Sequence, residues 1–466
     1  MNEIIRWSAT QTAQAIAVRE VSVTEVTRAH LARVDHCEPH LRAVVEPFGD
    51  RAMEQARAMD ASRPDDLPPL WGLPVTVKIN VDMEGHPNSN GVPALNKTPC
   101  VEDAPVVQNI KAAGAVILGR TSTPEFSLRF FTSNPIYGLT LNPWDQGVTP
   151  GGSSGGASAA VASGMGVLGH GNDLGGSLRY PAYCTGLATL RPSMGRVPAF
   201  ARSAAEERPV AIQHMSVQGM IARTVADVQL SYGALSRRSP LDPLWRAAPD
   251  AGKPRLGRVG VCVDPVGEGV APRVAQAVEA AAGAARQAGL DVVEITPPMV
   301  AEAVTAWGQI LNADVQVKMM PAIREHGSAA VQKLADGYAA LFGVPDLEGY
   351  ITQHGMRLAC QRAWAGMFED IDALILPVSA AEPFAPDQDI AQPETLAEIM
   401  QAQRCLFMIN LLGLPGACVR TLDCAPVPLG VQVVGAMMDD LACLDVARAI
   451  EGQLGFDLGP IEPAGL

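Results

Sequence analysis

Two glycine-rich segments decide the fold of this 466-residue chain: TPGGSSGGASAAVAS at residues 149–163 and NDLGGSLRYPA at residues 172–182. Ten glycines fall between residues 151 and 176. Glycine lacks a Cβ, so a glycine-rich backbone bends sharply and brings its N–H groups close to one point. The segments therefore predict loops that position serine side chains. Only Ala157–Ser163 has the small, helix-forming residues of a helix.

Hydrophobic periodicity is lost between Pro135 and Pro198, and composition predicts that half of this segment is loop. Capping boxes at Ser8 and Ser22 predict two helices in the first 40 residues. The other predicted elements are a strand in GLPVTVKINV (72–81), a helix from 105 to Gly114, the strand AVILG (115–119), a strand at 258–264, a helix over Arg273–Gln287, the strand DVVEI (291–295), and core strands at Ala373–Pro377 and Gly430–Gly435. This alternation predicts an α/β fold.

The charge balance excludes several classes of function. Lys and Arg number 35 against 49 Asp and Glu, the net charge is −14, and 48% of the residues are hydrophobic. Such a chain forms a globular core and offers no basic run to a nucleic acid or an anionic membrane. No stretch reaches the ~18 apolar residues of a membrane span. The longest candidate, Cys405–Val419, is interrupted by Asn410 and Pro415.

Other sequence features predict the compartment and the absence of bound metal. The N-terminus, MNEIIRW, lacks the apolar segment of a secretory signal, so we expect a cytoplasmic protein. The nine cysteines include no C-x-x-C pair and the eight histidines no H-E-x-x-H spacing, so neither disulfides nor a metal site is expected. We expect no cofactor.

Two short motifs in the glycine-rich region point to other functions. Gly164, Gly166 and Gly169 match G-x-G-x-x-G, but a dinucleotide site needs a preceding strand, and here an alanine-rich helix precedes the motif. Residues 151–155 match the G-x-S-x-G of α/β-hydrolases, but the preceding DQGVTP is no hydrophobic strand. A dinucleotide-binding protein is kept as an alternative of a different class.

A third interpretation uses the whole region. GLPVTVK (72–78), TPGGSSGG (149–156) and NDLGGSLRYPA (172–182) together resemble the amidase signature family. Further blocks resemble the family in the same order: TPEFS (123–127), NPWD (142–145), CTGLATLRPSMGRVP (184–198), MIARTVAD (220–227) and PLGVQVVG (428–435). The resemblance covers roughly residues 8–451, and its ordered blocks are far more specific than either short motif.

The resemblance implies a single large α/β/α sandwich with a mixed central β-sheet flanked by helices. Family blocks lie on both sides of the proline-rich segment 236–256, the best linker candidate, so we expect one domain over residues 1–466. Its expected parts are N-terminal helices (1–65), a catalytic core with the signature loops (66–235), a linker-like loop (236–256), and a C-terminal part that completes the sheet and the substrate pocket (257–466).

The resemblance also implies chemical roles. Amide hydrolysis needs an activated nucleophile, a proton for the leaving nitrogen and a site for the developing oxyanion. By position in the family motifs, Ser177 is the nucleophile, Ser153 relays a proton, and Lys78 is the base. The peptide bond between Gly152 and Ser153 is expected to be cis. The residues expected to form the oxyanion hole are Leu174, Gly175, Gly176 and Ser177. The residues expected to support these loops are Ser154, Asp173 and Arg179.

Lys78 can act as a base only when its amine is neutral. A free lysine has a pKa of about 10.4, and burial away from carboxylates lowers that pKa. Lys78 lies in a strand rich in Val and Ile, which predicts such burial. Many relatives resemble V-K-D-N where this chain has V-K-I-N at residues 77–80. Ile79 therefore takes the place of an aspartate whose carboxylate would lie next to the lysine in the sequence.

The expected substrate is a small apolar or aryl amide, with carbamates (urethanes) or esters as further substrates. Family members often resemble TDTGGS where this chain has NDLGGS at residues 172–177. Leu174 therefore places an apolar side chain where the second threonine of that motif is polar. Aromatic and methionine residues in poorly matched segments are candidates for an apolar pocket: Phe200, Met215, Trp307, Met319, Met320, Tyr338, Phe342 and Phe384.

Two further alternatives belong to the family. The chain could be the glutaminase subunit of a tRNA-dependent amidotransferase, which would need a partner protein. A catalytically silent member is disfavoured, because Lys78, Ser153 and Ser177 are all present. The expected partner is a small-molecule amide or carbamate; no nucleic acid and no membrane are expected, and a homodimer is left open.

Overall fold

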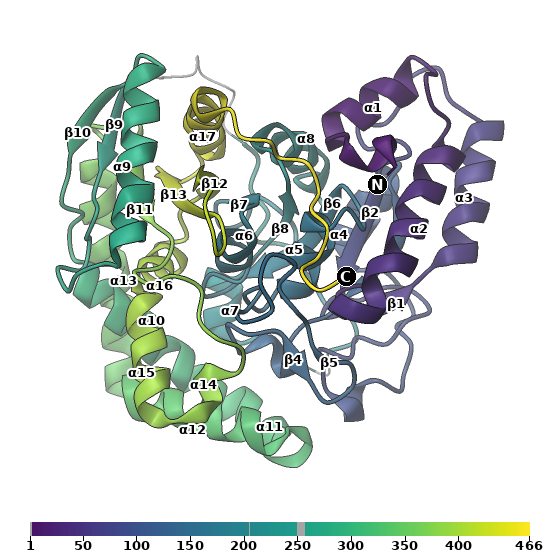
Figure 1. Ribbon diagram of the computed structural model, residues 1–466. Helices are drawn as coiled ribbons and strands as arrows, with labels where there is room; N and C mark the ends of the chain where they lie inside the picture. Colours follow the sequence, from purple (N-terminus) through teal and green to yellow (C-terminus); the bar gives the residue numbers. More distant parts are fainter. Residues whose placement is uncertain (1, 205, 249–256) are drawn as a thin grey trace.

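One mixed β-sheet runs through the molecule, for which the computed structural model describes residues 2–204, 206–248 and 257–466 (Figure 1). From edge to edge, the 11 strands are β1 (Glu46–Pro47), β3 (Val116–Thr121), β2 (Pro74–Lys78), β6 (Leu168–Asp173), β8 (Val217–Ala222), β7 (Ala188–Arg191), β12 (Gly416–Leu422), β13 (Leu429–Gly435), β11 (Ala373–Pro377), β9 (Arg258–Val261) and β10 (Asp291–Glu294). A separate hairpin pairs β4 (Ser133–Asn134) with β5 (Gly138–Leu139).

Helices flank this sheet, as expected from the sequence. They are α1 (Ala9–Ala17), α2 (Val23–Leu41), α3 (Gly49–Ala61), α4 (Pro105–Ala112), α5 (Gly155–Ala162), α6 (Arg179–Thr185), α7 (Val210–Met215), α8 (Val225–Leu235), α9 (Pro272–Gln287), α10 (Val300–Asp314), α11 (Met320–His326), α12 (Ala329–Phe342), α13 (Leu347–Met367), α14 (Gln388–Ala391), α15 (Pro393–Ala402), α16 (Arg404–Leu412) and α17 (Asp440–Leu454). Short 3₁₀ turns are η1 (Glu3–Arg6), η2 (Pro93–Leu95) and η3 (Glu125–Ser127), and η4 (Val315–Met319) is a π-helical turn.

The sheet is mixed because parallel and antiparallel pairs alternate in blocks. The pairs β3–β2, β2–β6, β11–β9 and β9–β10 are parallel, whereas the pairs that lead from β6 through β8, β7, β12 and β13 to β11 are antiparallel. Figure 1 shows α1, α2 and α3 at the β1 end of the sheet and α9 at the β9–β10 end. The predicted α/β class with a mixed central sheet is confirmed.

Local sequence signals account for the first elements. Ser8 and Ser22 form the predicted capping boxes, and α1 and α2 begin directly after them. The strand predicted in residues 72–81 is β2, and all five of its residues are buried. A strand between two parallel neighbours is covered on both faces, which explains why its sequence is apolar without alternation.

The glycine-rich segment contains more regular structure than its composition predicts. The expected helix is present as α5, but the segment also contains β6, α6 and β7. The glycines of β6 disfavour a strand in isolation, yet α5 packs directly on them. A Cβ at Gly169 would lie 3.1 Å from the Ala157 Cβ, and one at Gly171 would lie 2.6 Å from Ser154 Oγ. Close packing of α5 therefore requires glycine in this strand.

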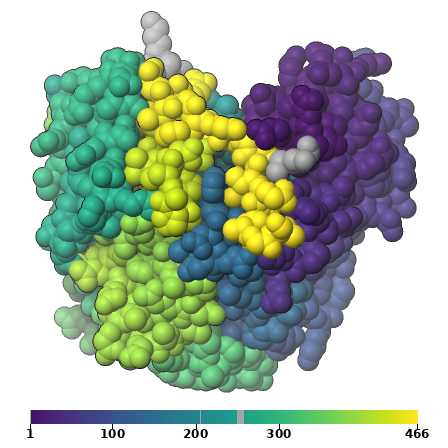
Figure 2. Space-filling view, in the orientation of Figure 1, coloured from purple at the N-terminus to yellow at the C-terminus, as the bar shows by residue number. Residues whose placement is uncertain are grey.

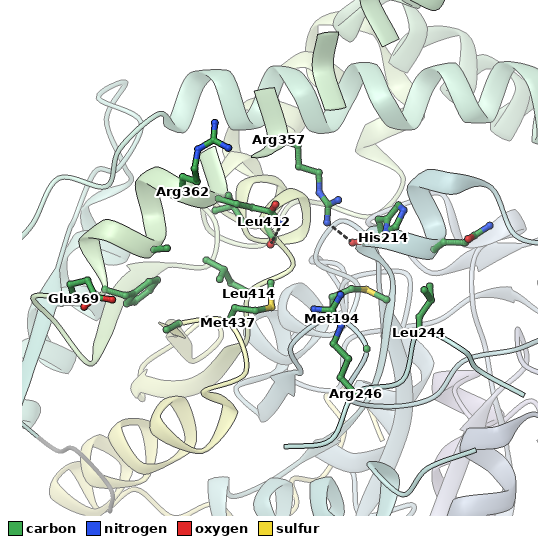
Figure 3. A pocket seen from close by; sticks show the side chains of 16 residues that line it. Met194, His214, Leu244, Arg246, Arg357, Arg362, Glu369, Leu412, Leu414 and Met437 are labelled. Atoms are coloured by element: carbon green, nitrogen blue, oxygen red, sulfur yellow. Dashed lines mark hydrogen bonds between the residues drawn. The ribbon is translucent and has the colours of Figure 1, made fainter. Parts of the chain in front are cut away.

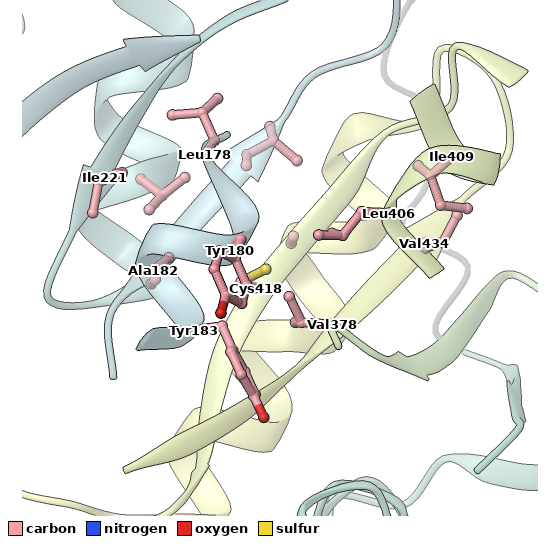
Figure 4. Close-up of a cluster of buried hydrophobic side chains, with 14 of the residues drawn as sticks. Leu178, Tyr180, Ala182, Tyr183, Ile221, Val378, Leu406, Ile409, Cys418 and Val434 are labelled. Atoms are coloured by element: carbon pink, nitrogen blue, oxygen red, sulfur yellow. The ribbon is translucent and has the colours of Figure 1, made fainter. Parts of the chain in front are cut away.

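The sheet continues across the predicted linker. Strands β1 to β8 precede segment 236–256 in the chain and β9 to β13 follow it, yet β7 pairs with β12 in one sheet. Residues 236–248 contain no helix or strand, and residues 249–256 lie outside the described residues. Buried side chains of α6, α16 and the central strands fill the space between both parts, including Tyr180, Leu406 and Val434 (Figure 4).

The C-terminal segment ties the two ends of the chain together. Figure 2 shows residues after α17 crossing the surface to the N-terminal helices. Glu462 accepts hydrogen bonds from Arg33 (2.9 Å) and lies 2.8 Å from His36 Nε2, both on α2, and Ile461 N donates to Ala162 O of α5. None of the described helices combines the length and apolar character that a membrane crossing requires.

Gly156 sets the distance between α5 and the end of β3. A Cβ on this residue would lie 2.5 Å from Ser122 N and 2.7 Å from Ser122 O, which are backbone atoms that cannot rotate away. We expect Gly156→Ala to lower the free energy of unfolding by about 1–3 kcal/mol, the usual effect of overpacking. Urea denaturation followed by circular dichroism measures this change.

Gly283→Ala in α9 is the matched control, because a Cβ at Gly283 would meet no atom of the described residues within 4 Å. Alanine is favoured over glycine within a helix by about 0.5–1 kcal/mol, so this variant should be slightly more stable than the natural chain. An equal loss of stability in the two variants would contradict the packing argument.

Candidate active site

Lys78 lies at the centre of the site, at the carboxyl end of β2. Its side chain is fully buried, and Nζ lies 2.7 Å from Ser153 Oγ, 2.8 Å from Asn172 Oδ1 and 3.2 Å from Ser154 Oγ. Because β2 and β6 are parallel, the end of β6 meets Lys78 at the same edge of the sheet. The structure thus brings Lys78 and both adjacent serines of the first loop together.

The surroundings of Lys78 favour a neutral amine. Burial lowers the pKa of Lys78 well below its usual range, and the charge of Asp173 only partly opposes this effect. Among the described residues, no carboxylate forms an ion pair with Nζ, and the neighbouring Ile79 is fully buried. A neutral amine can accept a proton, so Lys78 is suited to act as a base near neutral pH.

The loop before α5 fixes Ser153. The Gly152–Ser153 peptide bond is cis, which is the geometry that the family resemblance implies. Ser153 O accepts a hydrogen bond from Thr123 Oγ1 (2.9 Å). On the other side, a Cβ at Gly152 would lie 2.5 Å from Arg129 O. Close backbone contacts therefore hold the Ser153 hydroxyl beside Lys78.

Ser177 lies in the loop between β6 and α6 and lines the same cavity as Ser153. This cavity, here called the serine cavity, has a volume of about 240 Å³. Ser177 is 9% exposed, and its hydroxyl forms no hydrogen bond with any of the described residues. The described contacts include a hydrogen bond from Lys78 to Ser153 and none from Ser153 to Ser177, so two of the three predicted catalytic residues are in direct contact.

Leu174 and Ser177 of the Ser177 loop line the serine cavity. Within the described part of the chain, the N–H groups of Leu174, Gly175 and Ser177 have no hydrogen-bond acceptor. The N–H of Gly176, in contrast, donates to Asp173 Oδ1 (2.9 Å). Of the four residues expected to form the oxyanion hole, three therefore have a free N–H, whereas Gly176 anchors the loop.

Glycine is required at both loop positions for reasons of space. Gly176 has a φ of 111°, a conformation that other residues rarely adopt, and a Cβ there would lie within 3.0 Å of Leu406 Cβ. A Cβ at Gly175 would lie 2.9 Å from the ring of Trp307, which itself stacks on Phe407 with ring centroids 3.9 Å apart. The helices α10 and α16 thus press directly on this loop.

Asp173, the last residue of β6, is fully buried and paired with arginine. Its carboxylate accepts hydrogen bonds from Arg179 Nε and Nη2 (both 3.0 Å) and from Asn410 Nδ2 (2.8 Å), and Arg191 Nε lies 3.8 Å away. Burial raises the pKa of this carboxyl, but Arg179 and Arg191 outweigh burial and hold the pKa well below its usual range. The predicted supporting residues Asp173 and Arg179 thus form one buried network.

Sequence reasoning did not identify the amide side chains around Lys78. Asn172 accepts a hydrogen bond from Lys78, and its side chain exchanges two hydrogen bonds with Asn80 (2.9 and 3.2 Å). Asn80 Nδ2 also donates to Ser127 Oγ (2.9 Å). The available signal is the spacing of Asn80, two positions after Lys78, because such residues share one side of an extended chain.

Few of the residues expected to line an apolar pocket reach the serine cavity. Phe200 and Met319 line it, together with Phe126, Leu174 and Ile212. The remaining candidates do not line the cavity and belong to the hydrophobic core or pack against it: Met215, Trp307, Met320, Tyr338, Phe342 and Phe384. Helix packing explains the difference, since Trp307 of α10 and Phe342 of α12 contact each other and the Phe407 ring.

The two short motifs have structural roles. Gly164, Gly166 and Gly169 lie where α5 ends and β6 begins, so the order is helix then strand, the reverse of a dinucleotide site. Residues 151–155 follow residues 140–150, which contain no strand, so the strand that precedes an α/β-hydrolase nucleophile is missing.

Removing the Asp173 charge should destabilise the protein. Asp173→Asn leaves Arg179 and Arg191 buried without an anion, and breaking a buried ion pair in this way lowers the free energy of unfolding by about 3–5 kcal/mol. The folded-state pKa of Asp173 lies below its unfolded value. Its contribution is therefore complete above about pH 4 and is lost as the pH falls toward the folded-state pKa. Urea denaturation between pH 7 and pH 3 should show the two proteins converging.

Asp291→Asn is the control, because Asp291 pairs with Arg258 at the exposed edge of the sheet. Exposed pairs contribute little to stability, so this variant should unfold close to the natural chain at both pH values. A stability gap between Asp173→Asn and the natural chain that widens in acid would refute the assigned direction.

Comparisons with known proteins agree on one family. The amidase family model matches residues 25–444. The chain is 42% identical over 456 residues to indoleacetamide hydrolase of Bradyrhizobium diazoefficiens, covering 97% of this chain and 87% of that protein. It is 31% identical over 486 residues to a glutamyl-tRNA(Gln) amidotransferase subunit of Nitratidesulfovibrio vulgaris, covering 97% of each.

Solved structures share the fold. A bacterial aryl acylamidase of the amidase signature enzymes superposes with a TM-score of 0.86 at 24% identity, covering 100% of both chains. The 6-aminohexanoate cyclic dimer hydrolase superposes with a TM-score of 0.84 at 24% identity, covering 99% of each. Given the family match over most of its length and the 42% identity to a curated amide hydrolase, the chain belongs to the amidase family and is an amidase signature hydrolase that acts on amides.

Proposed function

We propose that this amidohydrolase cleaves small apolar or aryl amides through an acyl-enzyme on Ser177, with Ser153 as proton relay and Lys78 as base. The observation that carries the proposal is the buried amine of Lys78, which contacts Ser153 Oγ at 2.7 Å and has no carboxylate partner among the described residues. A lysine held neutral in this way can take a proton that a charged lysine cannot.

The proposed reaction begins with proton transfer. Ser177 Oγ attacks the amide carbonyl while its proton passes to Ser153 Oγ, and the Ser153 proton passes to Lys78 Nζ. The carbonyl oxygen becomes an oxyanion, and the free N–H groups of Leu174, Gly175 and Ser177 support its stabilisation. Collapse of this intermediate breaks the C–N bond, and the proton on Lys78 returns through Ser153 to the leaving nitrogen.

Hydrolysis of the ester formed on Ser177 completes the cycle. Water attacks the acyl carbonyl, and its proton follows the same path to Lys78. The C–O bond to Ser177 then breaks, Ser177 regains its proton, and a carboxylic acid leaves the site. Asn172 supports this cycle by holding Nζ at 2.8 Å, so that the amine stays directed toward Ser153 in both protonation states.

The dimensions and walls of the serine cavity support a small, apolar substrate. Its volume of about 240 Å³ lies below the range of about 300–1,000 Å³ that is usual for ligand sites. Phe126, Leu174, Phe200 and Met319 give part of its wall an apolar surface, beside polar residues that include Arg208 and Gln218. The 42% identity to an indoleacetamide hydrolase favours an aryl acetamide within this class. Acyl-enzyme chemistry of this kind extends to carbamates and esters, which we include as further proposed substrates.

Trapping the acyl-enzyme tests the nucleophile. Incubation with a slowly hydrolysed aryl carbamate should add the acyl mass to a peptide that contains Ser177, as detected by mass spectrometry. Ser177→Ala should abolish the adduct, because it removes the attacking oxygen. Ser153→Ala should slow its formation by about 10²-fold or more, because the proton path to Lys78 is interrupted.

Ser163→Ala is the matched control. The Ser163 hydroxyl donates to Ala159 O (2.9 Å) and does not line the serine cavity, so this variant should form the adduct at the natural rate. An adduct on Ser153 or Ser154 in place of Ser177 would overturn the assignment.

Substrate preference tests the apolar class. We expect kcat/KM for phenylacetamide to exceed that for acetamide by roughly tenfold to hundredfold, the gain from burying one aromatic ring. Leu174→Thr, which places a hydroxyl in the cavity wall, should reduce this ratio by roughly tenfold. Steady-state ammonia release measures both values.

Leu441→Thr on α17 is the control, since Leu441 is partly exposed and does not line the serine cavity. L-Glutamine belongs in the same series of substrates. Turnover of glutamine above that of phenylacetamide would favour the glutaminase alternative, and equal turnover of phenylacetamide and acetamide would refute the apolar class.

A further inference from the structure

A second cavity, larger than the serine cavity, lies on the other side of α7. It has a volume of about 640 Å³, and its lining comes from α7, α13, the end of α16 and the loops at residues 194–195, 244–246 and 436–437 (Figure 3). None of the described residues lines both cavities, but α7 borders each of them: Ile212 lines the serine cavity, and Gln213 and His214 line the second one. We call it the arginine cavity.

The charges of the arginine cavity are unbalanced. Arg246, Arg357 and Arg362 line it, and among the described residues Glu369 is the single acidic one in the lining. None of the three arginines forms an ion pair with any of the described residues. In a chain whose net charge is −14, three unpaired guanidinium groups around one cavity mark a site that is complementary to an anion.

Arg357 is held in place toward this cavity. Its Nε donates to Leu411 O (2.7 Å) and its Nη2 to His214 O (3.2 Å), and Figure 3 shows the side chain extended from α13 toward His214. Burial lowers the pKa of Arg357, and the charge of Arg246 lowers it further. Burial likewise lowers the pKa of His214, with a contribution from Arg357. Burial is the larger cause of both pKa shifts and the nearby arginines add to it, while the charge of Asp314 partly opposes the shift of His214.

Most of the other described lining residues are apolar, and Gln213, His214 and Gln361 are polar. Leu244, Leu412, Leu414, Met194 and Met437 surround the space beside Arg357 and Arg246 (Figure 3). The volume lies within the usual range for binding sites of organic molecules, which combine apolar walls with a few fixed polar groups. An inorganic anion would leave these apolar side chains exposed to water, whereas an organic anion with an apolar body would bury them.

We propose that the arginine cavity binds an organic carboxylate with an apolar body, its carboxylate between Arg357 and Arg246 and its body against the leucine and methionine side chains. Planar guanidinium groups bind carboxylates through paired hydrogen bonds. Since the two sites share none of the residues that the structure describes, occupancy of the arginine cavity is compatible with a substrate in the serine cavity. The assignment does not depend on the proposed function.

Titration calorimetry of the full chain with naphthalene-1-acetate tests this proposal. We expect saturable binding that weakens about tenfold or more in Arg246→Glu and in Arg357→Gln, with kcat/KM for phenylacetamide within about twofold of the natural value. The Arg246 side chain forms no hydrogen bond with a described residue, so Arg246→Glu tests the charge without removing a structural contact. Naphthalene-1-ethanol, which has the same rings and no charge, should bind at least tenfold more weakly.

Two controls distinguish binding in the arginine cavity from binding elsewhere on the protein. Arg286→Glu makes the same charge change at an exposed position of α9 and should leave binding unchanged. Arg208→Gln alters the serine cavity and should also leave it unchanged. The proposal would be overturned if the natural chain did not bind the probe or if Arg246→Glu bound it with unchanged affinity. It would also be overturned if Arg286→Glu weakened binding as much as Arg246→Glu, or if Arg208→Gln abolished binding.

Discussion

The removal of Lys78 from water is the constraint on which the rest of the structure depends. An amine at the end of a strand that is covered on both faces loses its solvation, and no carboxylate of the described residues restores it by pairing. What remains around Nζ is a set of uncharged oxygen atoms, from Ser153, Ser154 and Asn172. The glycines of the two serine loops allow the backbone to bring those atoms close enough.

The network around Asp173 complements this constraint. The Asp173 carboxylate, at the end of β6, would stabilise a charged Lys78 if the carboxylate turned toward the amine. Its oxygens are bound by Arg179, Arg191 and Asn410 instead. The same carboxylate holds Gly176 N–H and so shapes the loop that carries Ser177. The buried Asp173–arginine network therefore keeps this carboxylate from pairing directly with the base and orients the loop of the nucleophile.

The sequence predicted an element correctly where the signal lies within the element itself or where a family motif covers it. Helices α1 and α2 begin at capping boxes formed by Ser8 and Ser22, which the local sequence encodes. Strand β2 is likewise encoded by its own apolar run. Sequence reasoning failed for β6, whose Gly169 and Gly171 are explained only by α5 packed on top of them. It failed equally for Asn172 and for most of the pocket residues, because their neighbours come from distant parts of the chain and the spacing along the sequence does not reveal them.

The strand order has a consequence for how the protein is made. A ribosome releases β1 to β8 first and β9 to β11 later, yet β12 and β13, which join the two halves of the sheet, come from residues 416–435 near the end of the chain. During translation β7 and β11 therefore each expose an unpaired edge, the kind of surface on which nascent chains aggregate. Leu406 and Asn410, which brace the Ser177 loop, also emerge late. Until residues 404–435 have been made, the two halves of the sheet therefore stay unjoined and the Ser177 loop lacks these two contacts.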